Sequence, residues 1–346
     1  MAFLKIDNVR ICGFSACVPK TIVSNEITSR ADELAYGSED FVKTTGVRER
    51  RIDNRFASSD LCYEAAEKLI SDLNWDKKEI DALIFVSQTR DYIVPSTSTI
   101  LQDRLGLSRE CFSEDISMGC SGWVYALSTL SSLMQTGQIK KALLLTGEIG
   151  IYNSDEDMLF GSAGTATALE YNESVHSMYF HLGTDGSGYD TIIIPDGGAR
   201  NPFNEQSLIL EEVDGHKSNR VQTRMKGMDV FSFGISTAPK SVKRLSEKFN
   251  LNYLESDYFI FHQANMKMNK MIEKKLKLDT EKVPYSMTYF GNTSSASIPL
   301  TIVTELKNKI ENKPTKFVCC GFGVGLSWGT VAFKTENLVI SNLVEI

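Results

Sequence analysis

The amino-acid sequence predicts an α/β fold, because short apolar runs typical of buried strands alternate with segments of helical periodicity. The chain has 346 residues, of which 42% are hydrophobic. This length is enough to bury a large core and corresponds to about two domains. A weak internal repeat is also present, and it favours two related α/β halves.

The expected elements follow from where the apolar residues lie. Runs of consecutive apolar residues predict buried strands at 81–89, 140–148, 257–263 and 316–322. Segments with apolar residues at helical spacing predict helices at 58–73, 97–105, 121–136, 237–249, 265–277 and 296–311. The region 183–228 is rich in Gly, Asp, Asn and Arg and is expected to form long surface loops.

The internal repeat relates two strand–helix–strand–helix series. Asp81 begins an apolar strand, which is followed by a helix, a second strand and Cys120 at a helix start. Asp257 begins a similar series, in which "VPYSMTYFG" (283–291) is the expected second strand and Asn292 precedes the next helix. If the halves are duplicates, a pseudo-two-fold axis brings both helix N-termini to one central site.

Composition excludes several classes of function. The net charge of -7 and the pI near 5.3 argue against bulk nucleic-acid binding and suit a cytoplasmic protein. We expect no membrane span, because no apolar run approaches the length of about 20 residues that crossing requires. We also expect no signal peptide. The seven cysteines form no CxxC pair and the four histidines lack ligand spacing, so we expect reduced thiols and no metal site.

Cys120 is the first candidate for chemistry. The stretch from Glu110 reads as a strand, a tight turn at "GCSG" and an apolar helix. A cysteine at a helix N-terminus faces unpaired N–H groups and the positive end of the helix dipole, and both favour the nucleophilic thiolate. The alternative is a buried structural cysteine, and Cys120 alone does not decide between the two.

Two later segments favour a site. His262 ends the apolar strand "YFIF", at the carboxyl edge where α/β sheets place their sites, and the polar residues "QAN" follow it. Asn292 precedes a helix that Ser294 or Ser295 could cap, so its amide is free to donate to a developing negative charge. The turn "GFGVGLSWG" (321–329) is either a simple hairpin or a source of backbone N–H groups for an oxyanion.

Together these motifs resemble a known family. "GCSG" with Cys120, "HQAN" with His262, "GNTSSASIP" with Asn292 and "GFGVGLSWG" are similar, in the same order, to the β-ketoacyl-acyl-carrier-protein synthase III group of the thiolase superfamily. "TTGVRERR" (44–51) also resembles an N-terminal segment of that family. The likeness covers nearly the whole chain, and four spaced motifs together are far more specific than any one of them.

The resemblance implies a fold and a reaction. The fold would be the thiolase-like αβαβα five-layered fold with two pseudo-symmetric halves, residues 1–170 carrying the nucleophile and 171–346 carrying His and Asn. Cys120 would accept an acyl group from a thioester. His262 and Asn292 would then hold a malonyl-carrier thioester during decarboxylation. The resulting enolate would attack the acyl-cysteine and give a 3-oxoacyl thioester.

The resemblance also implies secondary roles and partners. Val324 and Gly323 would present the oxyanion site, and Phe322 would disfavour the malonyl carboxylate. Val94 would line the acyl pocket, and Lys267 would bind the acidic acyl-carrier protein. The enzyme would be a homodimer without a metal or other cofactor, its substrates being acyl thioesters of acyl-carrier protein or coenzyme A.

Two alternatives remain open at this stage. One is acyl transfer from a thioester to an oxygen or nitrogen acceptor on the same fold. The other is a non-catalytic acyl-binding homologue, against which the retained Cys120, His262 and Asn292 argue.

Overall fold

Two β-sheets form the frame of the protein. The structure is a computed structural model that describes residues 2–26, 38–152, 157–173, 176–213, 216–311 and 313–346. The larger sheet has the order β17-β2-β8-β7-β5-β6, with β18 also paired to β2. Its strands are β2 (Val9–Val18), β5 (Ala82–Val86), β6 (Phe112–Ile116), β7 (Lys141–Glu148), β8 (Ala163–Tyr171), β17 (Val339–Ile340) and β18 (Val344–Glu345).

The second sheet has the order β1-β9-β16-β15-β14. Its strands are β1 (Ala2–Ile6), β9 (Met178–Thr184), β14 (Tyr258–Phe261), β15 (Thr315–Gly323) and β16 (Ser327–Thr335). Three short pairs lie outside both sheets: β3 (Ile22–Ser24) with β4 (Glu49–Arg51), β10 (Ile192–Ile193) with β13 (Arg224–Met225), and β11 (Glu211–Val213) with β12 (His216–Ser218).

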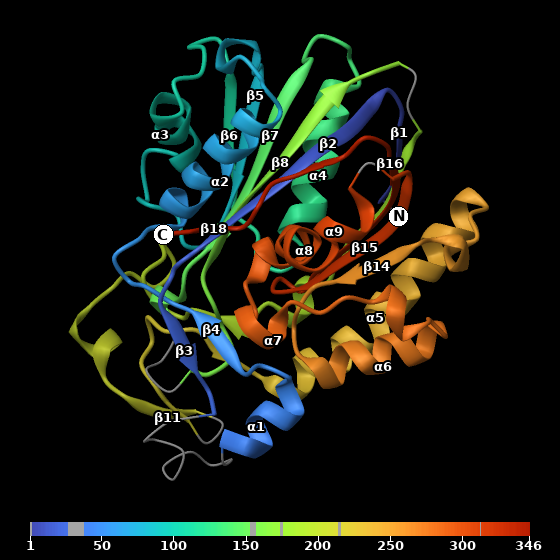
Figure 1. The fold of residues 1–346 in the computed structure, drawn as a ribbon. Coiled ribbons are helices and arrows are strands. Elements are labelled where there is room, and N and C mark those ends of the chain that lie inside the picture. The colour runs from blue at the N-terminus through green and yellow to red at the C-terminus, as the bar shows by residue number, and fades with distance from the viewer. Residues whose placement is uncertain (1, 27–37, 153–156, 174–175, 214–215, 312) are drawn as a thin grey trace.

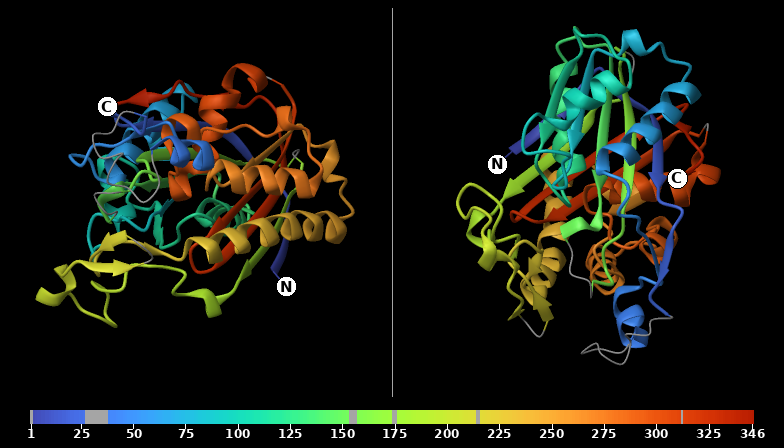
Figure 2. Two further views of the ribbon diagram at one scale, coloured as in Figure 1. Left: turned by 90° about the horizontal axis from the view of Figure 1, so that it is seen from below. Right: turned by 90° about the vertical axis from the view of Figure 1, so that its left-hand side faces the viewer.

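Helices cover both outer faces of the sheets and fill the space between them. The helices are α1 (Ser38–Thr45), α2 (Ser58–Asp72), α3 (Thr97–Arg104), α4 (Gly122–Met134), α5 (Gly227–Phe249), α6 (Met266–Leu276), α7 (Met287–Phe290), α8 (Ser297–Thr301) and α9 (Lys307–Ile310), with a π-helical segment, η8 (Ile302–Leu306), between the last two. In Figures 1 and 2, α2 and α3 lie on one side of the molecule, α5 and α6 on the other, and α4 and α8 between the sheets.

The apolar core follows this layering. The central cluster joins the inner faces of both sheets to α4 and α8, with fully buried residues such as Trp123, Leu127 and Leu300. A second cluster lies between the larger sheet and α2 and α3, and a third between the smaller sheet and α5 and α6. The predicted five-layered αβαβα fold is therefore confirmed.

The predicted division at residue 170 holds only for the middle of the chain. The larger sheet gives way to the smaller between β8, which ends at Tyr171, and β9, which begins at Met178. The terminal strands cross this division, because β1 belongs to the smaller sheet and β17 and β18 belong to the larger.

Two predicted elements were wrong in type or extent. The segment 283–291 contains helix α7 rather than a strand, because the side-chain oxygen of Gln263 accepts hydrogen bonds from the N–H groups of Ser286 and Met287 at the start of the helix, at 3.0 and 3.3 Å. Helix α5 begins at Gly227 instead of residue 237, because its first turns pack Val230 and Phe231 against the third core cluster.

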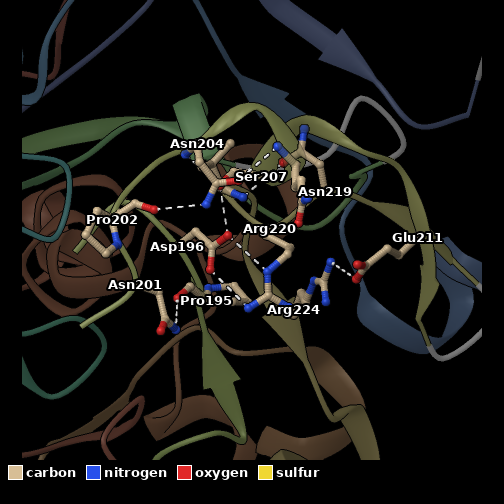
Figure 3. Close-up of polar contacts among 12 residues, drawn as sticks. Pro195, Asp196, Asn201, Pro202, Asn204, Ser207, Glu211, Asn219, Arg220 and Arg224 are labelled. Carbon is tan, nitrogen blue, oxygen red and sulfur yellow. Dashed lines mark hydrogen bonds and ion pairs between the residues drawn. The ribbon is translucent and has the colours of Figure 1, made fainter. Parts of the chain in front are cut away.

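The segment between β9 and α5 was expected to form long loops. It contains short strands and 3-10 helices instead, and polar side-chain contacts hold them together. Asp196 is its centre: its carboxylate accepts hydrogen bonds from Arg220 Nε and a second guanidinium nitrogen, both at 3.0 Å, and from Ser207 Oγ at 2.9 Å (Figure 3). Arg224 makes a further ion pair with Glu211 at 2.7 Å. These contacts give the segment a defined path without a core of its own.

The predicted repeat is visible at the strand starts. Asp81 precedes β5 and accepts hydrogen bonds from the N–H groups of Lys140 and Lys141, at 2.7 and 3.2 Å. Asp257 precedes β14 and accepts one from the N–H of Lys316, at 2.8 Å. Lys140 follows Asp81 by 59 residues and Lys316 follows Asp257 by 59 residues, so the same strand-pairing device occurs once in each half.

These hydrogen bonds at the strand starts should contribute similarly to the stability of both halves. We expect Asp81→Ala and Asp257→Ala each to lower the free energy of unfolding by about 1 kcal/mol, since each removes hydrogen bonds at the start of a parallel strand pair. Urea unfolding followed by circular dichroism measures the change. Glu247→Ala, an exposed change on α5, is the control and should stay within about 0.5 kcal/mol. An effect in only one half would contradict the structural equivalence.

Candidate active site

A cavity of about 320 Å³ lies where the two halves meet, and Cys120, His262 and Asn292 all line it. The three residues come from different elements: the turn before α4, the segment after β14 and the segment before η7 (Ser294–Ala296). Much of the remaining wall is apolar, and includes Leu159, Phe160, Ile192, Ile194, Met225 and Phe231. A polar cluster at an apolar cavity is a suitable arrangement for a thioester with an acyl chain.

Cys120 is held in a tight turn at the start of α4. The N–H of Gly122 donates to the carbonyl of Gly119 at 2.7 Å, and the cysteine is only 9% exposed. Burial raises the pKa of the Cys120 thiol, while hydrogen bonds from the Val324 backbone and the Ser294 side chain act in the opposite direction. Desolvation therefore opposes the predicted effect of the helix N-terminus on this thiol, and the thiolate remains a prediction.

His262 is a neutral imidazole within the cavity wall. Burial lowers its pKa to about 3, against a smaller opposing effect of a hydrogen bond to the Ser294 backbone. Its Nδ1 lies 2.9 Å from Ser297 Oγ, and that oxygen also accepts a hydrogen bond from the N–H of Gln263 at 3.4 Å. Ser297 can therefore donate its own hydrogen to Nδ1, which leaves Nε2 to carry the ring proton.

Asn292 is fixed through both its backbone and its side chain. Its N–H donates to the carbonyl of Leu159 at 2.9 Å, and its own carbonyl accepts from the N–H of Gly161 at 3.0 Å. Its Oδ1 accepts from the N–H of Ser294 at 2.9 Å. The Nδ2 group has no hydrogen bond within the part of the chain that the structure describes, so it is available as a donor to a bound molecule.

The end of β15 lies directly against the cysteine. A Cβ atom added at Gly323 would lie 2.7 Å from both Cβ and Sγ of Cys120, so only glycine fits there. The backbone of Val324 also makes a hydrogen bond to the Cys120 sulfur. Phe322 lines the same cavity, with its ring 5.7 Å from that of His262 and nearly perpendicular to it.

The predicted place of Val94 in the acyl pocket remains a prediction. Val94 does not line the cavity within this chain, and its side chain is 80% exposed. The reason is that the segment after β5 contacts the cavity at Gln88 and Thr89 and then runs outward before α3. Lys267 is exposed on the first turn of α6, between Asn265 and Met268, which do line the cavity, and its predicted role remains a prediction.

Sequence reasoning missed Glu148. This carboxylate ends β7, is 6% exposed and lines the cavity together with Cys120. The signal was present, because Glu148 ends the apolar run "ALLLTGE" as His262 ends "YFIF". Ser294 was considered only as a helix cap, whereas its side chain contacts the Cys120 sulfur.

Neither a metal cluster nor a membrane-spanning helix occurs in the described ranges. Among those residues, no group of three or more His, Cys, Asp and Glu side chains is placed to hold a metal ion. Within the same ranges, no helix combines the length and the apolar character that a membrane crossing requires.

Comparisons with known proteins agree with the geometry. Residues 114–186 match the family model for 3-oxoacyl-[acyl-carrier-protein] synthase III, and residues 247–335 match the model for its C-terminal part. The β-ketoacyl-[acyl-carrier-protein] synthase III of Clostridium acetobutylicum is 33% identical over 95% of this chain and 99% of its own length. The enzyme of that name from Streptococcus mutans is 32% identical over 96% and 100%.

Solved structures show the same likeness in three dimensions. The crystal structure of a 3-oxoacyl-(acyl-carrier protein) synthase from Burkholderia xenovorans superposes with a TM-score of 0.92 at 37% identity, covering 100% of this chain and 99% of the other. The synthase III of Pseudomonas aeruginosa gives a TM-score of 0.83 at 27% identity, over 96% and 99%.

The contact between Gly323 and Cys120 gives a prediction. We expect Gly323→Ala to slow alkylation of Cys120 by iodoacetamide about 10²-fold, because the added methyl group must displace the sulfur or the β15 end. Intact-mass spectrometry with peptide mapping measures the rate at Cys120. Gly186→Ala is the matched control, since a Cβ there meets no atom within 4 Å. Equal rates in both variants would show that the sulfur is not confined by β15.

Proposed function

The chain belongs to the 3-oxoacyl-[acyl-carrier-protein] synthase III family, and from this premise we propose that Cys120, His262 and Asn292 together carry out a decarboxylative Claisen condensation. The substrates are an acyl thioester and a malonyl thioester of acyl-carrier protein, and the product is a 3-oxoacyl thioester. The observation that carries the proposal is the convergence of these three side chains, from separate elements of both halves, on one largely apolar cavity.

In the first step Cys120 takes the acyl group. Its sulfur attacks the thioester carbonyl, and the carbonyl oxygen becomes an oxyanion. The backbone N–H groups of Cys120 and Val324 both approach the sulfur, so they are suited to hold that oxyanion. The acyl-cysteine divides one difficult reaction into two easier ones. The apolar wall of the cavity supports binding of the acyl chain.

In the second step His262 and Asn292 stabilise an enolate. The bond between the malonyl methylene and its carboxylate breaks, carbon dioxide leaves, and the electron pair moves toward the thioester oxygen. Nε2 of neutral His262 and Nδ2 of Asn292 donate hydrogen bonds to this oxygen. One such donor typically lowers the activation barrier by about 3–4 kcal/mol. The carbanion then attacks the acyl-cysteine and expels the Cys120 thiolate.

Phe322 assists the loss of carbon dioxide. Its aromatic ring lines the cavity beside His262 and offers no hydrogen bond to a carboxylate. Transfer of a carboxylate from water to such apolar surroundings costs free energy, whereas transfer of neutral carbon dioxide does not. The ring therefore favours the decarboxylated state.

The carrier protein binds near α6. Lys267 is exposed beside the cavity-lining residues Asn265 and Met268, and its ammonium group suits an acidic partner. The two thioesters supply every atom of the product, so the reaction requires no redox or metal cofactor. With a net charge of -7 and seven free cysteines, we place the enzyme in the cytoplasm.

We also propose that the enzyme is a homodimer. Strand β6 forms one edge of the larger sheet, with β5 as its only neighbour among the described strands. Tyr92, Ile93 and Val94 on the nearby segment are 60%, 79% and 80% exposed. An open strand edge beside an apolar patch favours pairing with a second copy.

Acyl transfer to an oxygen or nitrogen acceptor would use the same acyl-cysteine. The free Nδ2 donor of Asn292 favours condensation, because an enolate needs this donor and simple acyl transfer does not.

The two steps can be separated by mutation. We expect Asn292→Ala to lose decarboxylation of malonyl-acyl-carrier protein by about 10²–10³-fold, while an acyl adduct on Cys120 still forms. Cys120→Ala should show the converse: no adduct, with decarboxylation retained. Carbon dioxide release and intact mass measure the two steps. Equal loss of both steps in Asn292→Ala would count against its proposed role, and an adduct in Cys120→Ala would place the nucleophile elsewhere.

The dimer gives a separate prediction. We expect the wild-type protein to have twice the mass of one chain in light scattering after size-exclusion chromatography, and Ile93→Glu to shift it toward the single-chain mass. Leu254→Glu is the control, since Leu254 is also an exposed apolar residue but lies in η5 (Tyr253–Glu255), next to α5. A single-chain mass for the wild-type protein would refute the proposed homodimer.

A further inference from the structure

Arg50 is a buried cation in β4, within the segment "TTGVRERR" (44–51). It is 6% exposed, and it does not itself line the cavity that contains Cys120. A buried charge is costly unless its partners compensate for the hydration that it loses. The groups that hold Arg50 therefore indicate what this charge does in the protein.

Three acceptors surround the guanidinium of Arg50. Its Nε donates to Oδ1 of Asn25 at 3.2 Å. One terminal nitrogen donates to the carbonyl of Phe160 at 3.3 Å and lies 3.7 Å from a carboxylate oxygen of Asp157. Two of these partners hold the same stretch of chain, because Asn25 also donates to the carbonyl of Met158 at 2.8 Å and Asp157 accepts from the N–H of Phe160 at 3.2 Å. The arginine thus fixes the chain around Phe160, which lines the cavity.

The same stretch of chain pairs with Asn292. The N–H of Asn292 donates to the carbonyl of Leu159 at 2.9 Å, and its carbonyl accepts from the N–H of Gly161 at 3.0 Å. Phe160 and Asn292 form an isolated parallel bridge. Carbonyl groups of successive residues in an extended segment point in opposite directions. The carbonyl of Phe160 therefore meets Arg50, while its two neighbours meet Asn292.

Arg50 also packs against the residue before Asn292. Gly291 has a φ of +67°, and a Cβ added there would lie 3.0 Å from Cγ of Arg50. A Cβ added at Gly161 would overlap the carbonyl oxygen of Phe290. The arginine stem, the cavity wall and the chain that leads to Asn292 are therefore in close contact. A shift of the Arg50 side chain must move one of the other two segments.

The strand that carries Arg50 is itself fixed by backbone hydrogen bonds. The N–H of Arg48 donates to the carbonyl of Thr288 in α7 at 2.9 Å. The carbonyl of Arg51 accepts from the N–H of Ser162, the residue before β8, at 2.8 Å. Strand β4 is thus bonded both to α7 and to the start of β8, so the Arg50 side chain extends from a well-defined base.

We propose that Arg50 is a positioning residue for decarboxylation: its guanidinium holds the chain that places the Asn292 amide at the thioester oxygen of the malonyl substrate. The inference rests on the role of Asn292 in the proposed function. A misplacement of about 1 Å that starts far from the reacting atoms can cost about 10²-fold in rate. Cys120 is confined by a different contact, its close packing against Gly323, so its acylation does not depend on Arg50.

The arrangement requires the planar fork of an arginine. Arg50 uses its Nε for Asn25 and a terminal nitrogen for Phe160, so its donors are separated in space. The single nitrogen of a lysine cannot occupy both positions. Arg50→Lys therefore keeps the positive charge beside Asp157 and most of the side-chain stem, but it loses at least one of the hydrogen bonds that fix the cavity wall.

The test compares Arg50→Lys with the wild-type protein in two assays. Carbon dioxide release from malonyl-acyl-carrier protein measures decarboxylation. Intact-mass spectrometry measures acylation of Cys120, using whichever of acetyl-, butyryl- or octanoyl-coenzyme A acylates the wild type fastest. We expect Arg50→Lys to slow decarboxylation by about 10- to 10²-fold and to leave acylation within about 2-fold of the wild-type rate. Arg10→Lys is the matched control and should change neither rate, because Arg10 donates to Glu170 at 2.9 Å outside the cavity.

Two further comparisons separate positioning from a general structural effect. In protein that carries Asn292→Ala, Arg50→Lys should slow decarboxylation no further, because the group that Arg50 positions is absent. Asp157→Asn weakens the same contact from its more exposed side, so it tests the proposal even if Arg50→Lys does not fold. We expect it to slow decarboxylation selectively. Thermal unfolding of each variant verifies that it is folded.

The outcomes are distinct. Equal loss of decarboxylation and acylation in Arg50→Lys would overturn the inference, because the arginine would then support the fold as a whole. The same loss of decarboxylation with and without Asn292 would overturn it too, as would unchanged decarboxylation in both Arg50→Lys and Asp157→Asn. If the wild type does not decarboxylate malonyl-acyl-carrier protein, the proposed function falls and takes the inference with it, whereas the other outcomes leave the proposed function standing.

Discussion

The close packing of the β15 end against the start of α4 is the constraint on which the site depends. Gly321 lies so near this turn that an added Cβ would be 2.7 Å from the Cys120 carbonyl oxygen, and Gly323 lies equally near the sulfur. The hydroxyl group of Ser121, before α4, also lies 2.7 Å from that of Ser327 at the start of β16, the strand paired with β15. Because α4 follows β6 of the larger sheet and β15 belongs to the smaller, this contact fixes the two halves relative to each other at Cys120.

Such tight packing determines the electrostatics of the site. Little water reaches the polar groups, so burial raises the pKa of Cys120 and Glu148 and lowers that of His262. The resting site therefore contains a thiol, a neutral imidazole and a carboxyl group that is half-ionised near pH 7. Hydrogen-bond donors in surroundings of low polarity act strongly on charge that develops during a reaction, and this is the condition that an oxyanion or an enolate requires.

The pattern of apolar residues in the sequence predicted the main strands and helices. It also predicted the three central residues of the site, because each of them lies at the end of a buried element. Cys120, His262 and Asn292 stand next to apolar runs whose periodicity is visible in the sequence. Interactions between distant segments were not visible. Gln263 caps α7 from another part of the chain, so the segment 283–291 was taken for a strand. The outward course of the segment bearing Val94 depends on tertiary packing and had no sequence signal.

The internal duplication explains why one cavity can combine different chemistry. Asp81 and Asp257 start equivalent parallel strand pairs, so each half brings two strand ends and one helix start to the axis between the halves. The first half contributes Glu148 at the end of β7 and Cys120 before α4. The second contributes His262 after β14 and Asn292 before α8. Side chains at strand ends can change without disturbing the core beneath them. Two copies of one scaffold can therefore carry different groups, a thiol and a carboxyl group in one half and an imidazole and an amide in the other, while their shared geometry keeps both sets within a single pocket.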